Sequence, residues 1–492
     1  MELRRLLTLD AVYRIAPPLL LFALLQSQHI APHDFWWHVR TGEIIAQTGS
    51  VPTLDSFSFT RAGEVWVNQS WLMQLALYGA FASGGAALVL FLHASAIAGG
   101  YTLLLGALQR SCGLRSGTAA GLVAAALGIV NWTVRPQSIS FLLFGILIAL
   151  IELHRRGRER ALWACVPLFA LWVNAHGAFV FGLLALGSYV IGELALWLWS
   201  GRPAAGQQRA LELAGAGLAS LAVLVLNPEG PLGMLEYVLG FVRGSPTTRI
   251  IEEFQPLELR TPQGVVFFGA WLLLGALLAR DRARPALDQI LALGVFGALA
   301  LLFYRCSPWF GFVYAPVLAR QLAPRFDAGP VRTGRARAIP AVYLALALLA
   351  VVSTLPWLRG SLGPDRPLLR ADTPVAAMQA LCTSAADSAR VYTELHFASY
   401  QTWACRRLPV FQDTRAELYP LAQWRDFLRL RAARFDWQEI ADRYALTHLL
   451  LSRVSQTDLI EAARASDRWV ERYQDPVAVL LERAQLAEAP VR

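Results

Sequence analysis

The stretch HDFWWHVRTGE, residues 33–43, follows directly after the first long hydrophobic segment of the chain. It places an aspartate, two histidines, an arginine, a glutamate and two tryptophans where that segment would leave a membrane. Apart from Asp10, the chain has only Asp34 and Asp55 as aspartates before Asp281. Polar groups at the end of a membrane span often mark a pathway or site, so this stretch predicts a functional site at a membrane surface.

The composition around this stretch is that of a membrane protein. The chain has 492 residues, of which 55% are hydrophobic and only 16% are charged, and its mean hydropathy is +0.43. A soluble protein of this size could not bury so much apolar surface. We therefore expect an α-helical polytopic membrane protein with about eleven spans and a small C-terminal α/β domain. The expected spans are residues 15–30, 84–107, 117–132, 138–153, 161–175, 178–199, 210–226, 263–279, 286–304, 308–320 and 339–357.

The basic residues set the expected orientation. All 44 are arginines, and within residues 1–357 they cluster before the first span and in short loops after every second span. That distribution argues against nucleic-acid binding in spite of the net charge of +9. By the positive-inside rule these loops and the N-terminus are cytoplasmic. The arginine-rich, lysine-free composition favours a bacterial gene, so we expect the inner membrane. Residues 27–32 form a poor cleavage site, which favours a retained first helix.

The expected outer side carries most of the candidate chemistry. Arg135, His176 and Arg305 each lie at the end of a span, where a cation can meet a phosphate at the headgroup level. His176 could equally be a satisfied interfacial histidine, and Arg305 a snorkelling arginine. The expected outer loops are residues 31–83, 133–137, 174–177, 227–262 and 305–307, together with everything after residue 358.

The first outer loop has the pattern of an amphipathic helix. Within residues 35–47 the apolar side chains can share one helical face, and His38, Arg40 and Glu43 fall largely elsewhere. Such a helix lies along the membrane surface, with the tryptophans of residues 36–37 at headgroup level. The alternative is an aromatic belt with ordinary surface charges.

Two aspartates are the catalytic candidates. For Asp34 we favour a functional role over a structural one. Asp55 is open, because the sequence from Pro52 to Ser56 is also a good turn or helix cap. Glu43 is expected to be a solvated surface residue.

Residues 358–492 change character, since charge rises and the long apolar runs end. Strand-like runs alternate with helical stretches there, which predicts a small α/β domain on the outer side. Asp413-Thr414-Arg415 is the best candidate contact, although a cap or an ion pair is the favoured interpretation. A disulfide between Cys382 and Cys405 is permitted outside the cytoplasm, and we leave it open. The strand-like runs are residues 391–394, 408–412, 448–452, 469–474 and 477–481.

Taken together, these features resemble the GT-C glycosyltransferases. This polytopic superfamily includes oligosaccharyltransferase catalytic subunits, protein O-mannosyltransferases and aminoarabinose transferases. Its members carry an essential acidic residue in a long first outer loop, just after the first span, and many have an outer C-terminal domain. Here residues 33–38 occupy the place of that acidic motif, and residues 41–45 with 49–52 look like the interfacial helix and turn. The acidic residue is single rather than an Asp-Glu pair, and a WWD-type motif is missing, which argues against protein N-glycosylation.

The resemblance implies a function and roles for the candidates. It implies a hexosyl- or pentosyltransferase that uses a polyprenyl-phosphate sugar and inverts the anomeric centre. The acceptor is then a glycan, a lipid or a protein on the outer side. Asp34 would be the base or a ligand of a divalent metal ion, and Asp55 would assist it. The candidate substrate or phosphate contacts are His38, Arg40, Arg135, His176 and Arg305.

Two other functions stay open at this point. One is a transporter or flippase for a lipid-linked glycan, which is expected to place polar residues in the middle of spans. The other is an O-antigen-type polymerase or ligase, for which Arg135, His176 and Arg249 would matter more than an early aspartate. The gathering of polar residues at outer span ends favours the transferase.

Overall fold

The structure is a computed structural model that describes residues 8–201, 204–242, 251–281, 284–328, 338–361 and 368–484. The chain divides into two compact units. The helical unit comprises Met1–Gln28, Gly84–Phe241 and Thr248–Arg366, and the mixed unit comprises His29–Ser83, Val242–Thr247 and Pro367–Arg492. Residues 29–83, which contain the expected first outer loop, therefore belong to the same compact unit as the C-terminal residues.

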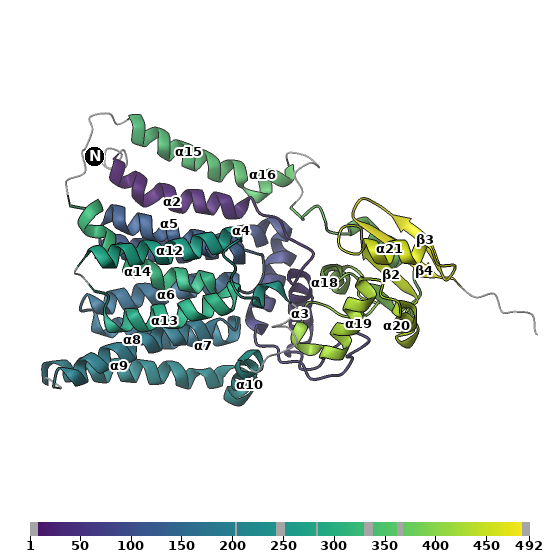
Figure 1. Cartoon of the computed structure of the whole chain (residues 1–492), viewed down its shortest axis with the longest axis horizontal. Helices are drawn as coiled ribbons and strands as arrows, with labels where there is room; N and C mark the ends of the chain where they lie inside the picture. The colour runs from purple at the N-terminus through teal and green to yellow at the C-terminus, as the bar shows by residue number, and fades with distance from the viewer. Residues whose placement is uncertain are drawn as a thin grey trace, which may run out of the picture. The chain divides into compact units, whose positions relative to one another are not determined.

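The helical unit consists of long helices that lie side by side (Figure 1). Each hydrophobic segment expected from the sequence contains a helix. Among the described residues, seven helices are long and apolar enough to cross a membrane, and α13 and α15 are shorter apolar helices. The prediction of a polytopic α-helical protein is confirmed. The helices are α2 (Leu9–Gln26), α4 (Trp71–Ser111), α5 (Leu114–Gly128), α6 (Ser138–Arg155), α7 (Cys165–Ala175), α8 (Phe179–Trp199), α9 (Ala204–Ala222), α10 (Gly230–Val242), α12 (Pro262–Arg280), α13 (Leu287–Leu302), α14 (Ser307–Phe326), α15 (Ala338–Thr354) and α16 (Pro356–Ser361).

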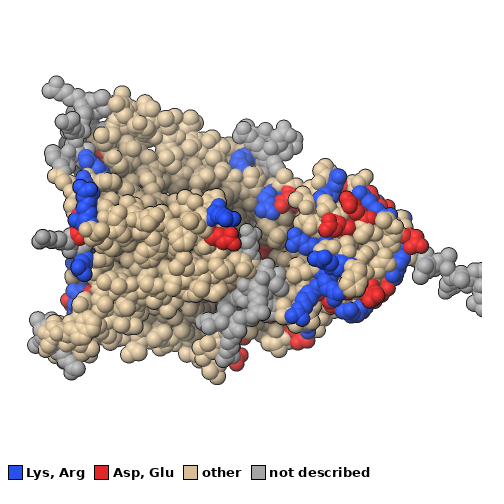
Figure 2. Space-filling view, viewed as in Figure 1, with Lys and Arg blue, Asp and Glu red and all other residues tan. Residues whose placement is uncertain are grey.

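The surface of the helical unit matches a lipid environment. Its sides carry almost no charge in the view of Figure 2, and the charged residues gather at the ends of the helices. Large apolar side chains point outward, and Leu272 is 75% exposed. An apolar surface this large marks contact with a membrane or another protein.

Helix α4 is broken by a glycine. Gly85 has φ +59° and ψ −159°, which is not helical. A residue with a side chain is strained at such a φ value, whereas glycine adopts it readily. The span expected from residue 84 starts at this break, and residues 71–83 before it form a separate helical stretch that belongs to the mixed unit.

Helix α14 is the centre of the helical unit. Nearly all of its side chains are buried, and Trp309 and Phe312 pack against Phe141 and Phe144 of α6. Elsewhere small residues allow close packing, because a Cβ atom on Gly100 of α4 would collide with the backbone of Phe141. Small residues at such contacts are typical of helix packing inside membranes.

The long loop expected at residues 227–262 contains a helix. α10 begins at Gly230, whose φ of +66° turns the chain after Asn227. The amide of Asn227 fixes this turn by donating to the Val173 carbonyl at 2.8 Å. The apolar run from residue 230 to 242 explains the helix, and it was missed because it is too short for a span.

The mixed unit contains a four-stranded sheet in the order β1-β2-β4-β3. β1 is parallel to β2, and the other two pairings are antiparallel. The predicted α/β domain is therefore confirmed. Its elements are α3 (Phe35–Thr48), α17 (Val375–Ser384), β1 (Val391–Thr393), α18 (Leu395–Ala404), α19 (Leu421–Arg431), α20 (Trp437–Arg443), β2 (His448–Ser452), α21 (Thr457–Arg464), β3 (Trp469–Gln474) and β4 (Ala478–Arg483).

The prediction of a strand at residues 408–412 is wrong. Only Val410 pairs there, through isolated bridges to Ser58 and Val391. Pro409 has no N–H group, so it cannot donate to a strand ladder. The Val410 N–H donates to the Phe57 carbonyl at 2.8 Å instead, which joins the segment of residues 29–83 to the C-terminal residues.

The tryptophans of α3 are buried rather than placed on an outer face. Trp36 packs edge-on against Tyr400 of α18, and the Trp37 indole N–H donates to the Thr414 hydroxyl at 3.0 Å. Both side chains are less than 10% exposed. The prediction of a helix is confirmed, and the apolar face of α3 packs on the C-terminal residues, so these two tryptophans are buried in protein.

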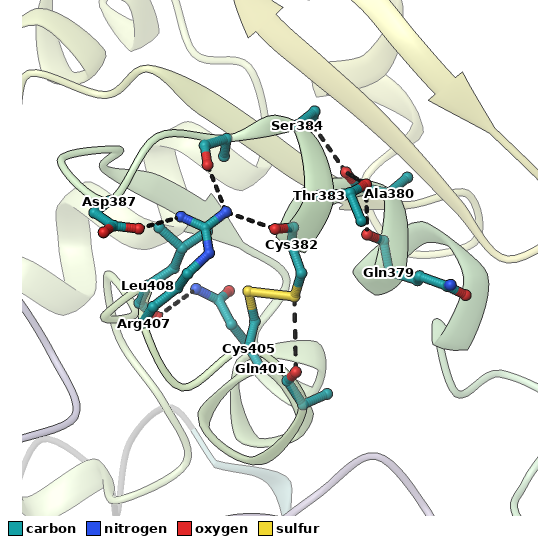
Figure 3. The surroundings of a disulfide bond; sticks show 12 residues. Gln379, Ala380, Cys382, Thr383, Ser384, Asp387, Gln401, Cys405, Arg407 and Leu408 are labelled. Atoms are coloured by element: carbon teal, nitrogen blue, oxygen red, sulfur yellow. Dashed lines mark hydrogen bonds and ion pairs between the residues drawn. A yellow bond between two sulfur atoms is a disulfide. The ribbon is translucent and has the colours of Figure 1, made fainter.

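Cys382 and Cys405 form a disulfide that joins the end of α17 to the end of α18 (Figure 3). Arg407 reinforces the link by donating to the carbonyls of Cys382 and Ala385, each at 2.5 Å. Its guanidinium also pairs with Asp387 at 2.6 Å. Disulfides persist outside the cytoplasm, so this bond fits an exported domain.

Candidate active site

Asp34 lies immediately before α3, in the mixed unit, and its side chain is half-buried. The backbone turns into the helix at this residue, with φ −48° and ψ −33°. The positive end of the helix dipole stabilises negative charge at such a position. Asp34 is thus a carboxylate at the start of a helix that directly follows the first span, as the sequence predicts.

A pair of histidines lies beside Asp34. The rings of His33 and His396 meet edge to face with their centres 4.0 Å apart. Burial, and after it the neighbouring His396, lowers the pKa of His33 to about 3, against the opposing effect of Asp34. His33 is therefore a neutral imidazole at physiological pH.

His396 is held by a buried carboxylate that the sequence reasoning missed. Glu394 caps α18, and its Oε2 accepts from the backbone N–H groups of His396 and Phe397 at 2.7 and 3.1 Å. Its Oε1 lies 3.7 Å from Nδ1 of His396. A Glu two residues before a His at a helix start was the available signal, but nothing local shows that this His meets His33.

His38 is buried on α3. Its Nδ1 accepts a hydrogen bond from the Gln74 amide at 3.2 Å, and its ring stacks against Trp37. The amide fixes the ring against α4. A substrate contact at His38 stays a proposal, and it would be made through Nε2, because Nδ1 is bound by Gln74.

Glu43 is buried, which corrects the expectation of a solvated surface residue. Its carboxylate is shared by Arg40 at 2.5 Å and by Arg406 at 3.1 Å. The Arg406 guanidinium also lies over the Trp403 ring, 4.9 Å from its centre. Two guanidinium groups with one carboxylate leave a net positive charge at this end of α3, although Arg406 comes from a distant part of the sequence.

Asp55 is completely buried and fully hydrogen-bonded. It accepts from the backbone N–H groups of Phe57 and Ser58, each at 3.1 Å, and from the Ser58 hydroxyl at 2.6 Å. It also pairs with Arg415 at 2.6 Å, and Arg415 pairs with Asp413 at 2.7 Å. These bonds match the turn-cap interpretation of Asp55 and the ion-pair interpretation of residues 413–415.

The helical unit holds a second polar group. Arg135 lies in the turn before α6, and Arg305 lies in the turn before α14. Glu253 bridges the two arginines, with Oε1 2.8 Å from Arg135 and Oε2 3.6 Å from Arg305. Arg305 also lies over the Phe254 ring, 4.5 Å from its centre. The structure thus brings two of the predicted phosphate contacts together, around a glutamate from the long segment between α9 and α12.

His176 lies between α7 and α8 and is held from α6. Its Nδ1 accepts from the backbone N–H of Ala178 at 3.1 Å and lies 3.1 Å from the Ser140 hydroxyl. The Trp172 indole N–H donates to that hydroxyl at 2.9 Å, so the hydroxyl proton points at the histidine. This network assigns the proton of the neutral ring to Nε2, which makes Nε2 a hydrogen-bond donor.

The predicted residues therefore fall into groups within each unit. Asp34 stands with two histidines in the mixed unit, and Arg135 stands with Arg305 in the helical unit. Arg249 lies outside the described residues. In the part of the chain that the structure describes, no group of three or more His, Cys, Asp or Glu side chains is placed to hold a metal ion. The donors beside Asp34 do not fit a divalent metal, and we derive no step through one.

Comparisons with known proteins bear on the fold. No family model and no curated protein sequence matches the chain. ArnT from Cupriavidus metallidurans, bound to undecaprenyl phosphate, matches with a TM-score of 0.52 and 13% identity, over 98% of this chain and 99% of that chain. The Archaeoglobus fulgidus oligosaccharyltransferase, tethered with an acceptor peptide, matches with a TM-score of 0.55 and 13% identity, over 96% of this chain and 74% of that chain.

A third structure agrees with these two. Archaeal AglB in complex with an inhibitory peptide and a dolichol-phosphate matches with a TM-score of 0.56 and 11% identity, over 96% of this chain and 74% of that chain. These enzymes are GT-C glycosyltransferases, and at such low identity the likeness concerns the fold. The chain has the fold of the GT-C glycosyltransferase superfamily.

Proposed function

We propose that the protein is a membrane glycosyltransferase that moves a sugar from a polyprenyl-phosphate donor to an acceptor on the outer side of the bacterial inner membrane. The match to ArnT bound to undecaprenyl phosphate carries the proposal, because it covers nearly the whole of both chains. The position of Asp34 supports it, since this carboxylate follows the first span α2 and starts α3.

The chemistry assigned to Asp34 is general base catalysis. Its carboxylate accepts the proton of the acceptor hydroxyl or amine while the acceptor atom bonds to the anomeric carbon. The bond from that carbon to the phosphate oxygen breaks, and its electron pair leaves with the polyprenyl phosphate. Attack from the opposite face inverts the anomeric centre. Burial lowers the pKa of the neighbouring His33 to about 3, so this ring is neutral beside the carboxylate at physiological pH.

Arg135 and Arg305 are assigned to the departing phosphate. Planar guanidinium groups match the oxygens of a phosphate, and a fixed positive charge stabilises negative charge as it develops. Glu253 holds both side chains in place and leaves a net positive charge on the group. His176 is a third candidate, because the network on its Nδ1 leaves Nε2–H as a donor.

Other residues have supporting roles in this proposal. Asp55 positions the turn at residues 55–58 rather than touching substrate, because its carboxylate is already bound by Arg415 and by the turn. Arg40 and His38 are assigned to contacts of the sugar or acceptor. We place the N-terminus in the cytoplasm and residues 358–492 on the outer side.

The proposal is tested with the purified protein in nanodiscs and polyprenyl-phosphate sugars from a lipid extract of the host. Host glycans are added as acceptors, and free polyprenyl phosphate is followed by mass spectrometry. Heat-unfolded protein is the control. Release that depends on folded protein and on added glycans supports a transferase. Donor that stays intact with every acceptor fraction but crosses to the other leaflet contradicts it and indicates a flippase.

A further inference from the structure

A basic cavity lies in the C-terminal part of the mixed unit, away from the residues assigned to catalysis. It has a volume of about 440 Å³ and lies between α19 and α21. Arg429, Arg431 and Arg434 line it on one side, and Ser455 and Asp458 line it on the other. Its volume is within the range of about 300–1,000 Å³ that is usual for small-molecule sites.

The charge of the cavity is positive. Arg429 is paired with Asp436 at 2.8 Å. Arg431 is held through its Nε, which donates to the Ser455 carbonyl at 3.2 Å, and Arg431 is itself one of the residues that line the cavity. Within the described ranges, neither Arg431 nor Arg434 forms an ion pair with a carboxylate. Figure 2 shows arginines gathered on this face, over the region labelled α19 and α20 in Figure 1.

The turn that carries Arg434 is fixed in a strained conformation. Ala433 has a φ of +44°, which is uncommon for a residue with a side chain. The Arg434 N–H donates to the Arg429 carbonyl at 3.0 Å, and the Arg434 carbonyl accepts from Trp437 at 2.8 Å. Strained backbone held in this way is often associated with binding sites. The turn presents Arg434 and the next residue, Phe435, on the surface.

Phe435 adds an aromatic face beside the cavity. It is 94% exposed, and the Arg429 guanidinium lies 5.7 Å from its ring centre. An aromatic ring with nearby guanidinium groups can stack against the apolar face of a sugar and bind its acidic group at once. A flat membrane surface would not require a concave cavity, and a single aromatic ring gives little anchorage in lipid.

We propose that this cavity binds an acidic saccharide, with a carboxylate or phosphate group on Arg431 and Arg434 and a sugar ring against Phe435. This proposal deepens the proposed function. It rests on that function only for the role of the bound saccharide as the acceptor. Binding itself requires neither the donor nor Asp34. The acceptor class is then an anionic glycan of the cell envelope.

The test measures binding to the full-length protein in nanodiscs of neutral lipid by microscale thermophoresis. The probes are trigalacturonate, which carries carboxylates, glucose 6-phosphate, which carries a phosphate, and neutral maltotriose. Trigalacturonate or glucose 6-phosphate should bind at least about tenfold more tightly than maltotriose, because charged hydrogen bonds contribute about 1.5–3 kcal/mol each. The better acidic probe identifies the source of the anionic group.

The variants test whether binding depends on the residues of this cavity or only on the positive charge of the surface. The double variant Arg431→Gln/Arg434→Gln should weaken acidic-probe binding about tenfold or more, and Phe435→Ala should weaken it by a smaller factor. Arg425→Gln on the same helix is the matched control, because Arg425 is exposed but does not line the cavity. It should leave binding within about twofold.

Three results would overturn the proposal. They are equal binding of maltotriose, unchanged binding in the double variant, or binding only to added vesicles that contain phosphatidylglycerol. The last result would assign the surface to the membrane. Asp34→Asn is included as a second control and should bind the probes like the wild type. Probe binding in that variant shows that the cavity functions even if the transferase assignment fails.

Discussion

Arg415 and Asp55 form a buried ion pair of 2.6 Å across 360 positions of the sequence. Neither side chain is exposed, and the Arg415 guanidinium also lies 4.8 Å from the Phe57 ring centre and 4.7 Å from the Trp66 ring centre. The pair fastens the segment of residues 29–83 to the C-terminal residues within the mixed unit. The loop that begins with Asp34 is therefore shaped by residues from the other end of the chain.

Removal of Arg415 should destabilise the mixed unit strongly. In Arg415→Met, the carboxylates of Asp55 and Asp413 stay buried without their cation, which typically costs about 3–5 kcal/mol. Thermal unfolding followed by tryptophan fluorescence measures the effect. The triple variant Asp55→Asn/Asp413→Asn/Arg415→Met should recover much of the loss, because it leaves no buried charge. A single variant as stable as the wild type would contradict the structural role of the pair.

The stability of the mixed unit should fall as the pH drops below about 6.5. Burial lowers the pKa of His33 to about 3 in the folded protein, from an ordinary value of 6.5. Between these values the unfolded chain binds the proton and the folded chain does not, so lower pH favours unfolding. The charges that face His33 are those of Asp34, Arg370, Asp372 and His396. Between pH 7 and pH 5, the unfolding temperature of the wild type should fall more than that of His33→Gln, because the glutamine cannot take up this proton on unfolding. Parallel pH profiles would contradict the burial of His33.

The disulfide should contribute measurably to stability. It closes a loop with a sequence separation of 23 residues, and the chain-entropy relation gives about 3 kcal/mol for a loop of this size. Cys382→Ser should therefore unfold at a lower temperature than the wild type in the absence of reductant. Cys112→Ser is the control, since Cys112 is a free cysteine. Equal unfolding temperatures for both variants would show that the bond does not stabilise the domain.

Substitution of one arginine beside Glu253 should lower the catalytic efficiency with the lipid-linked donor. In Arg305→Gln, one charged contact to the phosphate is lost, and kcat/KM for the lipid-linked sugar should fall about tenfold to a hundredfold. Arg325→Gln is the matched control, because Arg325 lies at the other end of α14 and pairs with Asp281. Equal losses in the two variants would point to general damage rather than phosphate binding.

Local patterns predicted the local structure well. Hydrophobic runs located the helices, and the helical spacing of apolar side chains in residues 35–47 predicted α3. Both patterns depend only on residues that are close together in the sequence. Partners from distant segments could not be predicted. Glu43 was expected in solvent because Arg406 lies far along the sequence, and His396 was overlooked because it meets His33 only in the folded unit. Pro409 was a local signal against a strand at residues 408–412. The prediction gave more weight to the apolar residues around it, which have the pattern of a strand.

If Asp34 is the base of a glycosyl transfer, its carboxylate is needed for the release of polyprenyl phosphate. The most direct measurement compares the release of free polyprenyl phosphate by wild type, Asp34→Asn and Asp467→Asn under identical conditions. Asp467 is an exposed carboxylate of the C-terminal part and makes a matched control. We expect Asp34→Asn to fold normally but to release no polyprenyl phosphate, and Asp467→Asn to match the wild type. Full release by folded Asp34→Asn would contradict this expectation.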